Sequence, residues 1–316
     1  MIKMLRRNIG SWLIVGALAT GCQSGPAITP TATSGPTRTI EHAGGKTQVP
    51  MLPQRVVVLD TAPLDTALAL GIKPVGTIVY GQLPEYLGDQ VNDIEIVGDG
   101  NEPNLETILQ LEPDLILSSK PGTERLYRRL SQIAPTVLAE DSGRTGDWPK
   151  HFRLYAEALG KSAQAEQLLQ TYQEQVQQVK QQINQPETIE ISVLSSYDSR
   201  IGAYTAGSFS GSVLQDLGLA RTPSQRATRR YAVQLSREAL PKLDGDFIFL
   251  IYSSHFPGGL QKTDFVTDSI FAQLSAVQQD RVCEVPNAVW IAGRSILAAQ
   301  QILTDVGKCL EEMRLN

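Results

Sequence analysis

The chain has 316 residues, which is enough for two domains of ordinary size. Its formal net charge is −5 and no basic stripe runs along it, which argues against nucleic acid as the main partner. No segment reaches the roughly 18–20 consecutive apolar residues that a membrane-spanning helix requires.

The N-terminus has the pattern of an export signal. A basic start with Lys3, Arg6 and Arg7 is followed by an apolar run over residues 9–20. About twelve residues is the usual length of the apolar part of a signal peptide and is too short for a membrane span. We therefore expect residues 1–21 to be a signal peptide.

Cys22 follows directly on three small residues, Ala-Thr-Gly, and this arrangement resembles a bacterial lipobox, in which the cysteine is lipidated and becomes the new N-terminus. A lipobox prefers leucine three residues before the cysteine, whereas Leu18 lies one position further back. The resemblance implies a lipid on Cys22, and the alternative is cleavage nearby without a lipid. Residues 22–37 are rich in Ser, Thr, Pro and Gly and are expected to form a flexible tether.

Two cysteines remain after Cys22, namely Cys283 and Cys309. An exported protein meets an oxidising environment, so an even pair of cysteines can form a disulfide. The alternative is two separate buried thiols, which are common core residues.

Strand-like and helix-like segments alternate in two blocks. The first block, residues 38–147, opens with a hairpin signal at Gly44-Gly45 and continues with apolar runs that are typical of buried parallel strands. A long helical region follows over residues 148–185, with an apolar stripe at three- and four-residue spacing. Strand and helix patterns then resume over residues 186–316. This order predicts an α/β protein with parallel sheets in two lobes.

Five segments, taken in order, resemble a known family: the substrate-binding lipoproteins of ABC importers for ferric siderophores, haem and cobalamin. The segments are PQRVVVLDTAPLDTALALGIKPVGT, EPNLETILQLEPDLILSS, GSVLQDLGLART, QLSREALPKLDGDFIFL and WIAGRSILAAQQILTDV. The resemblance implies two Rossmann-like lobes with central parallel sheets, joined by a single long α-helix, as in class III periplasmic binding proteins. It places the ligand in the cleft between the lobes. Because bending an intact helix breaks its hydrogen bonds, we expect only small closure around the ligand.

The sequence carries no pattern that predicts an enzyme. AGSFSGS has no serine at the centre of Gly-x-Ser-x-Gly, and VGDGNEPN lacks the third glycine of a dinucleotide-binding fingerprint. His42, His151 and His255 are far apart in sequence, and neither they nor the cysteines have metal-ligand spacing. We therefore expect no cofactor and no protein-held metal, because iron in a siderophore is already held by the chelator.

Candidate ligand contacts follow the predicted strands, since ligands of open α/β sheets bind at the carboxyl ends of strands. Arginine and aromatic side chains suit the oxygen-rich surface of a ferric chelate. The candidates at strand ends are Tyr80, Lys120, Arg200, Tyr252, Trp290 and Arg294. The run ARTPSQRATRRY adds Arg226, Arg229 and Arg230 as a basic loop over the mouth of the cleft. For each residue the alternative is a solvated loop charge or a packing aromatic.

The expected ligand is a ferric siderophore of the citrate or hydroxamate type. Ferrichrome-type binders of the family have an arginine just before the EPNLE stretch, whereas this chain has Gly100 near that position. The number of arginines suits an anionic chelate, and catecholates stay open for the same reason. One alternative is a protein of the same fold that binds haem or cobalamin. Another is a sensor or scaffold protein that takes no part in transport.

The resemblance also implies a partner: an ABC permease of the FecCD type together with its ATPase. In the family one acidic residue on each lobe pairs with permease arginines, and by motif these map to Glu124 and Glu238. The alternative is that each carboxylate merely begins a helix, where the helix dipole favours it. We expect a monomer that is anchored to the membrane by lipid and faces the periplasm or the cell exterior.

Overall fold

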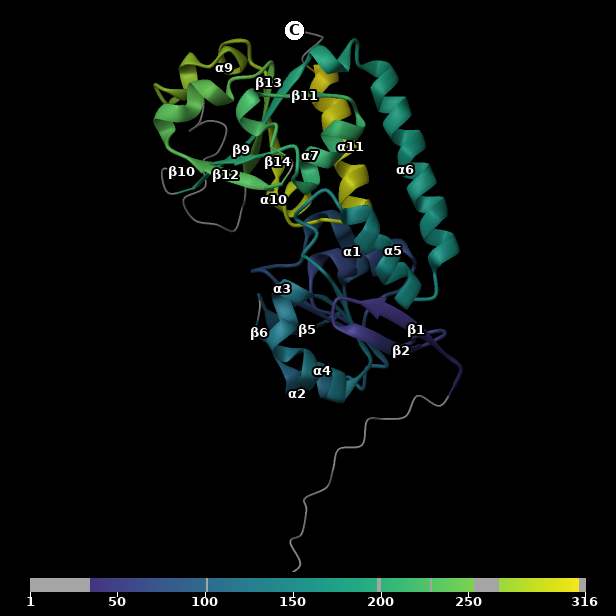
Figure 1. Ribbon diagram of the computed structural model, residues 1–316. Coiled ribbons are helices and arrows are strands. Elements are labelled where there is room, and N and C mark those ends of the chain that lie inside the picture. The colour runs from purple at the N-terminus through teal and green to yellow at the C-terminus, as the bar shows by residue number, and fades with distance from the viewer. Residues whose placement is uncertain (1–34, 101, 198–199, 228, 253–266, 313–316) are drawn as a thin grey trace, which may run out of the picture.

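The computed structural model describes residues 35–100, 102–197, 200–227, 229–252 and 267–312. The predicted signal peptide, Cys22 and nearly all of the predicted tether lie outside this range. Within it, two α/β lobes are stacked end to end and joined by helices along one side (Figure 1).

The chain enters the N-terminal lobe through an antiparallel hairpin. Its strands are β1 (Thr37–His42) and β2 (Gly45–Pro50), and they pair so that His42 faces Gly45. Gly45 has a φ of 118°, a backbone conformation that glycine adopts without steric cost. The hairpin predicted from Gly44-Gly45 is therefore confirmed.

The N-terminal lobe is built on a sheet in the order β6-β5-β4-β3-β7-β8, parallel except for β6. Its strands are β3 (Val56–Val58), β4 (Gly76–Val79), β5 (Glu95–Asp99), β6 (Glu102–Pro103), β7 (Leu115–Ser119) and β8 (Thr136–Ala139). The connecting helices are α1 (Thr61–Ala69), η1 (Glu85–Val91), α2 (Leu105–Gln110), α3 (Lys120–Thr123), η2 (Glu124–Leu126) and α4 (Tyr127–Ile133).

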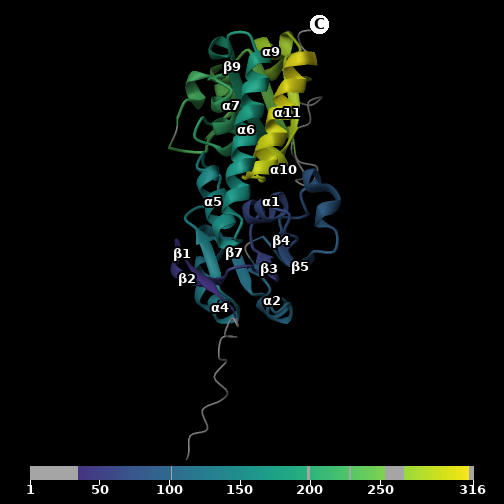
Figure 2. The same ribbon diagram turned by 90° about the vertical axis from the view of Figure 1, so that its right-hand side faces the viewer.

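Two helices form the connection between the lobes. These are α5 (Trp148–Ala158) and α6 (Ser162–Gln182), and α6 runs beside the C-terminal helix α11 (Ile296–Glu312) (Figure 2). The buried residues of α6 are Ala165, Leu169, Tyr172 and Val176, which lie on one face at the spacing that the sequence predicts. Ser162 makes no capping hydrogen bond, because it is already the first helical residue and Lys161 holds the cap position.

The C-terminal lobe has a mixed sheet in the order β12-β10-β9-β13-β14, with β11 also paired to β9. Its strands are β9 (Glu190–Tyr197), β10 (Arg200–Tyr204), β11 (Ala220–Arg221), β12 (Ala232–Leu235), β13 (Phe247–Tyr252) and β14 (Val282–Pro286). Its shorter helices are η3 (Pro186–Thr188), α7 (Phe209–Asp216), η4 (Pro223–Gln225), η5 (Arg237–Leu243), η6 (Phe271–Gln273), α9 (Ser275–Gln278) and α10 (Asn287–Trp290). Strands β9, β11, β13 and β14 pair in parallel, as expected, whereas β10 and β12 add antiparallel ladders.

Each central strand buries both of its faces, and the two faces belong to different cores. In β3, Val56 and Val58 pack into a core that continues through α5, α6, α7 and α11 into the C-terminal lobe, while Val57 faces a core confined to the N-terminal lobe. Strand β13 behaves in the same way, with Phe249 in the shared core and Leu250 in a core of the C-terminal lobe. The side of the molecule that carries the connecting helices is therefore one continuous apolar core.

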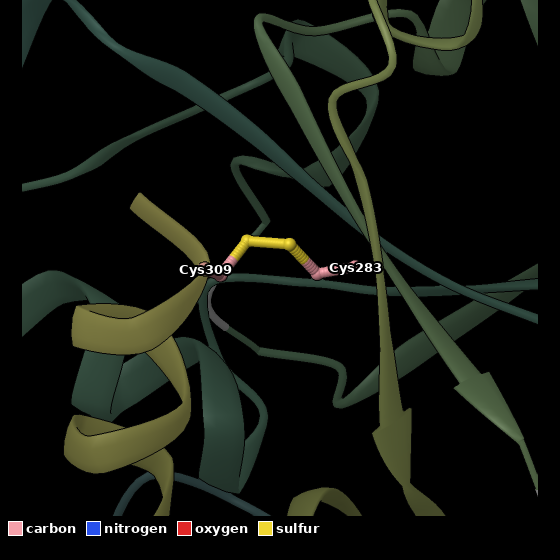
Figure 3. Close-up of a disulfide and its surroundings, with 2 residues drawn as sticks. All are labelled: Cys283 and Cys309. Atoms are coloured by element: carbon pink, nitrogen blue, oxygen red, sulfur yellow. A yellow bond between two sulfur atoms is a disulfide. The ribbon is translucent and has the colours of Figure 1, made fainter. Parts of the chain in front are cut away.

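A disulfide joins the last strand of the C-terminal sheet to the C-terminal helix. It links Cys283 of β14 to Cys309 of α11 across a Cα–Cα distance of 6.2 Å (Figure 3).

No helix in the described ranges is long and apolar enough to cross a membrane.

Candidate functional site

A pocket of about 260 Å³ lies between the lobes, where the strands of both sheets end. From the N-terminal lobe, Thr61 after β3 and Tyr80 after β4 line it. From the C-terminal lobe, Tyr252 at the end of β13 and Asn287 after β14 line the opposite wall. The pocket thus occupies the position where open α/β sheets bind ligands.

Arg294 lies at the floor of this pocket and joins the lobes. Its Nη2 donates a hydrogen bond to Asp60 Oδ1 at 2.5 Å and another to the Thr61 hydroxyl. Its Nη1 donates to the backbone carbonyl of Ser142 at 2.5 Å, and its Nε donates to the backbone carbonyl of Ala292 at 3.0 Å. Arg294 and Asp60 are both nearly fully buried. Because a buried carboxylate neutralises the guanidinium and protein oxygens accept its hydrogen bonds, Arg294 has little charge left for a ligand.

Asp60 is positioned by the start of α1 and by the neighbouring strand. It is the N-cap of α1, where Oδ1 accepts from the Thr61 backbone N–H at 2.8 Å, and its Oδ2 accepts from the Ser119 hydroxyl at 2.7 Å. Arg294 itself has a φ of 58°, in the left-handed region that non-glycine residues seldom adopt. The surrounding contacts hold it there, which indicates that the link between the lobes is a fixed feature of the pocket floor.

A second link between the lobes lies behind the pocket. Asp65 of α1 accepts hydrogen bonds from the backbone N–H groups of Leu297 and Ala298, both at 3.0 Å, and so caps the N-terminus of α11. The Tyr86 hydroxyl also donates to Asp65, at 2.9 Å. Burial raises the pKa of Asp65 to about 6, although these hydrogen bonds act in the opposite direction.

Two tyrosines give the pocket aromatic walls with neutral hydroxyls. Burial, followed by the charge of Asp60, raises the pKa of Tyr80 to about 12. Burial also raises the pKa of Tyr252, with a further contribution from Glu85. Both phenols therefore keep their proton at physiological pH and can donate a hydrogen bond to an oxygen-rich ligand.

Of the residues predicted from the sequence, Tyr80, Tyr252 and Arg294 line the pocket. Trp290 does not, and that prediction is wrong. Its side chain is fully buried, stacks on Phe249 with ring centroids 4.6 Å apart, and donates from Nε1 to Asp305 at 2.9 Å. The alternative of a packing aromatic holds for Trp290, because the short helix α10 turns this ring into the shared core.

The other predicted contacts lie around the pocket or away from it. Lys120 is paired with Glu140 at 3.1 Å and is not in the pocket wall. Arg226 pairs with Glu190 at 2.8 Å, at the amino end of β9, which is the end opposite to the ligand edge. The backbone of Arg200 opens β10, but its side chain, like His255, lies outside what the structure describes.

The basic run ends beside the pocket rather than in it. Arg229 and Arg230 are exposed, and the Arg230 carbonyl accepts from the Thr205 hydroxyl. The next residue, Tyr231, carries the guanidinium of Arg144 over its ring at 5.8 Å from the centroid. Arg144 does line the pocket.

Arg144 and Glu85 are pocket residues that the sequence reasoning missed. Arg144 follows β8, whose four residues are too few for a clear strand pattern in the sequence, so no strand end pointed to it. The signal that could have found it is the apolar stretch Thr136–Ala139 after Pro135, followed by a Ser-Gly-Arg-Thr-Gly loop. Glu85 begins η1, beyond the end of β4.

This architecture is that of a two-lobed ligand-binding protein. The two α/β lobes share one helical side, and the pocket lies at the carboxyl edge of both sheets. Residues 56–289 match the family model described as "Periplasmic binding protein", and the chain belongs to this family. It is 31% identical to "Probable siderophore-binding lipoprotein YfiY" of Bacillus subtilis, with 86% of this chain and 87% of that protein covered. It is 29% identical to "Fe(3+)-citrate-binding protein YfmC" of the same organism, with 86% and 85% covered.

A solved structure has the same fold. Staphylococcus aureus SirA, crystallised in complex with staphyloferrin B, superposes with a TM-score of 0.76 at 30% identity and covers 87% of this chain and 99% of its own. The family and these relatives are binding proteins. The fold expected from the sequence, two α/β lobes of the periplasmic binding protein type, is confirmed.

Proposed function

We propose that this protein binds a ferric siderophore between its lobes and delivers it to an ABC import permease of the FecCD type with its ATPase. The observation that carries the proposal is a pocket lined by Tyr80, Tyr252 and Arg144 at the edge of both sheets, in a chain of the periplasmic binding protein family. Neutral phenols and a guanidinium suit the oxygen atoms that surround chelated iron. The ligand, not the protein, would hold the iron.

A citrate-type or hydroxamate-type chelate suits the hydrogen-bond donors of this pocket. Such ligands present carboxylate or hydroxamate oxygens, which accept hydrogen bonds from arginine and from phenol hydroxyls. The likeness to a protein named for binding Fe(3+)-citrate supports this choice.

Titration of the tryptophan fluorescence tests the proposal. Trp290 is the last residue of α10, whose Asn287 lines the pocket, so its emission should respond to occupancy. We expect saturable binding of ferric citrate or of a ferric hydroxamate. Saturable binding of haem or cobalamin, with no ferric chelate bound, would contradict the proposal and support the alternative ligand classes.

We expect the protein to act outside the cytoplasm, as the family description indicates, on a lipid anchor at Cys22. A tether from Cys22 would hold the pocket near the permease and raise its effective concentration there. Cys22→Ser should release the protein from the membrane fraction or leave it unprocessed. An unchanged membrane fraction would contradict the lipid anchor.

Glu124 and Glu238 are the proposed contacts with the permease. Glu124 lies in η2 of the N-terminal lobe and Glu238 in η5 of the C-terminal lobe, and both are exposed. Glu124→Arg combined with Glu238→Arg should abolish import while ligand affinity in solution stays unchanged. Normal import by the double variant would contradict the docking role.

A further inference from the structure

The pocket carries opposite charges on its two sides. Arg144 lies toward Tyr231, with its guanidinium over that ring, and Arg229 and Arg230 precede Tyr231 in the chain. Glu85 lies on the other side of the pocket, because it follows β4 whereas Arg144 follows β8, and β3 and β7 lie between those two strands in the sheet. In the opposite lobe, Tyr252 ends β13, while Tyr231 precedes the edge strand β12. The pocket is therefore polarised, with a positive side at Arg144 and a negative side at Glu85.

Both charges are free to meet a ligand. Arg144 and Glu85 are exposed, and in the part of the chain that the structure describes neither has an ion-pair partner. Glu85 accepts a hydrogen bond from the Gln82 amide at 3.2 Å. Arg294, the other arginine in the wall, differs because Asp60 already neutralises it.

The two tyrosines reinforce this division. Tyr80 lies near Asp60, Arg294 and Arg144, whose charges all act on its hydroxyl. Tyr252 lies on the side of Glu85. A ligand that spans the pocket would thus meet hydrogen-bond donors and a cation at one end, and a carboxylate at the other.

We propose that the pocket selects a bipolar chelate, whose iron-binding oxygens face Arg144 and whose protonated amine arm faces Glu85 and Tyr252. This inference rests on the proposed function and names the ligand class within it. A chelate with acceptor oxygens on all sides would place one of them against the Glu85 carboxylate, which would weaken its binding. Glu85 is then the specificity-determining residue and Arg144 the one that sets the orientation of the ligand.

Ferrioxamine B gives a direct test, because this ferric trihydroxamate carries one pendant primary ammonium group that can be acetylated without altering the iron site. The wild-type protein should bind ferrioxamine B about three- to tenfold more tightly than its N-acetyl form, as expected for one exposed charge-assisted hydrogen bond. Glu85→Gln should bring the two affinities together by weakening only the ammonium form. Glu174→Gln, an exposed carboxylate on α6, is the matched control and should keep the preference.

The positive side is tested in the same titrations. Arg144→Gln should weaken both forms and ferric citrate by a similar factor, so the ratio between the two ferrioxamine forms should persist. Arg128→Gln, an exposed arginine on α4, should leave all affinities unchanged. Because a loss of folding would also lower every affinity together, the thermal unfolding of Arg144→Gln is measured alongside and should match that of the wild type.

The outcomes separate the two proposals. Equal binding of the ammonium and N-acetyl forms by the wild-type protein, or a preference that survives Glu85→Gln, overturns the bipolar pocket and leaves the siderophore function standing. Absence of binding to every ferric chelate overturns the siderophore function and the bipolar pocket with it.

Discussion

At the scale of single residues, the link between the lobes depends on two buried carboxylates with different partners. Asp60 meets a guanidinium, Arg294, and pairs with it at the pocket floor. Asp65 instead accepts hydrogen bonds from neutral groups, namely two backbone N–H groups of α11, the Tyr86 phenol and the Ser295 side chain. Burial disfavours the charged form of a carboxylate, and the Arg294 cation compensates this at Asp60, so the two residues should respond differently to substitution.

Asp60→Asn should strongly destabilise the protein, because it leaves the Arg294 charge buried without a counter-ion. Breaking one side of a buried pair typically costs about 3–5 kcal/mol in the free energy of unfolding. Urea denaturation measures this loss. Asp93→Asn is the control, since Asp93 pairs with Lys73 in solvent with its side chain 92% exposed and should change little. Equal losses in the two variants would contradict the structural role of the Asp60–Arg294 pair.

Asp65 should make the stability of the protein depend on pH in a defined direction. Burial raises its pKa to about 6 in the folded state, from 3.8 for the unperturbed group, so folding favours the protonated form. This contribution is fully present below pH 3.8 and is lost as the pH rises through about 6. The unfolding free energy of the wild type, minus that of Asp65→Asn, should therefore fall between pH 4 and 7 by up to about 3 kcal/mol.

Thermal or urea unfolding of both proteins across that pH range measures the difference. Asparagine does not titrate, so the comparison removes the contribution of all other groups. A difference that grows as the pH rises would contradict the raised pKa of Asp65.

At the scale of elements, long periodic segments were predictable and short ones were not. Val56–Val58 and Phe247–Tyr252 bury both faces, so continuous apolar runs identify them. The segment Arg237–Leu243 has the composition of a helix but forms a 3₁₀-helix, because Pro241 lacks the N–H that an α-helical turn needs. Short helices next to each other are equally hard to delimit, since the extended Leu274 separates η6 from α9 without a Gly or Pro to mark the break.

The site shows the same limit. Strand ends located Tyr80 and Tyr252, since their strands were recognised. Trp290 could not be placed, because the direction of its ring depends on the four-residue helix α10. Asp60 and Arg294, which pair and neutralise each other, lie 234 positions apart in the chain. No local pattern in the sequence can predict a pairing over that separation.

The disulfide ties two elements of the C-terminal lobe, and its removal should lower stability. Cys283 of β14 and Cys309 of α11 close a loop with a sequence separation of 26 residues. A loop of this size corresponds to about 3 kcal/mol in the chain-entropy model. Replacing both cysteines by alanine should lower the free energy of unfolding by that order. Reduction of the wild type should lower the free energy of unfolding by a similar amount. The same reductant should leave the double variant unchanged. A wild type whose stability is unaffected by reduction would contradict a stabilising role for the disulfide.

At the scale of the whole molecule, the two lobes are not independent bodies on a flexible joint. The apolar core on the helical side runs from β3 through α5 and α6 to α11 and β13 without interruption. The Asp60–Arg294 pair and the Asp65 cap add polar links between the pocket and this core. Opening the lobes widely would therefore expose apolar surface and break buried polar contacts at the same time.

Ligand binding should for this reason change the shape of the molecule only slightly. We expect the radius of gyration from small-angle X-ray scattering to change by less than about 1 Å on saturation with a ferric chelate, as in preorganised complexes. Amide exchange in the middle of α6 should stay slow in both states, because small closure does not open the hydrogen bonds of the helix. Gln177→Gly, an exposed change in mid-α6 that weakens the helix by about 1 kcal/mol, should speed this exchange and show that the measurement is sensitive to opening. A contraction of several ångströms, together with loss of α6 protection in the ligand-free protein, would mean that the shared core opens and that the lobes move as separate bodies.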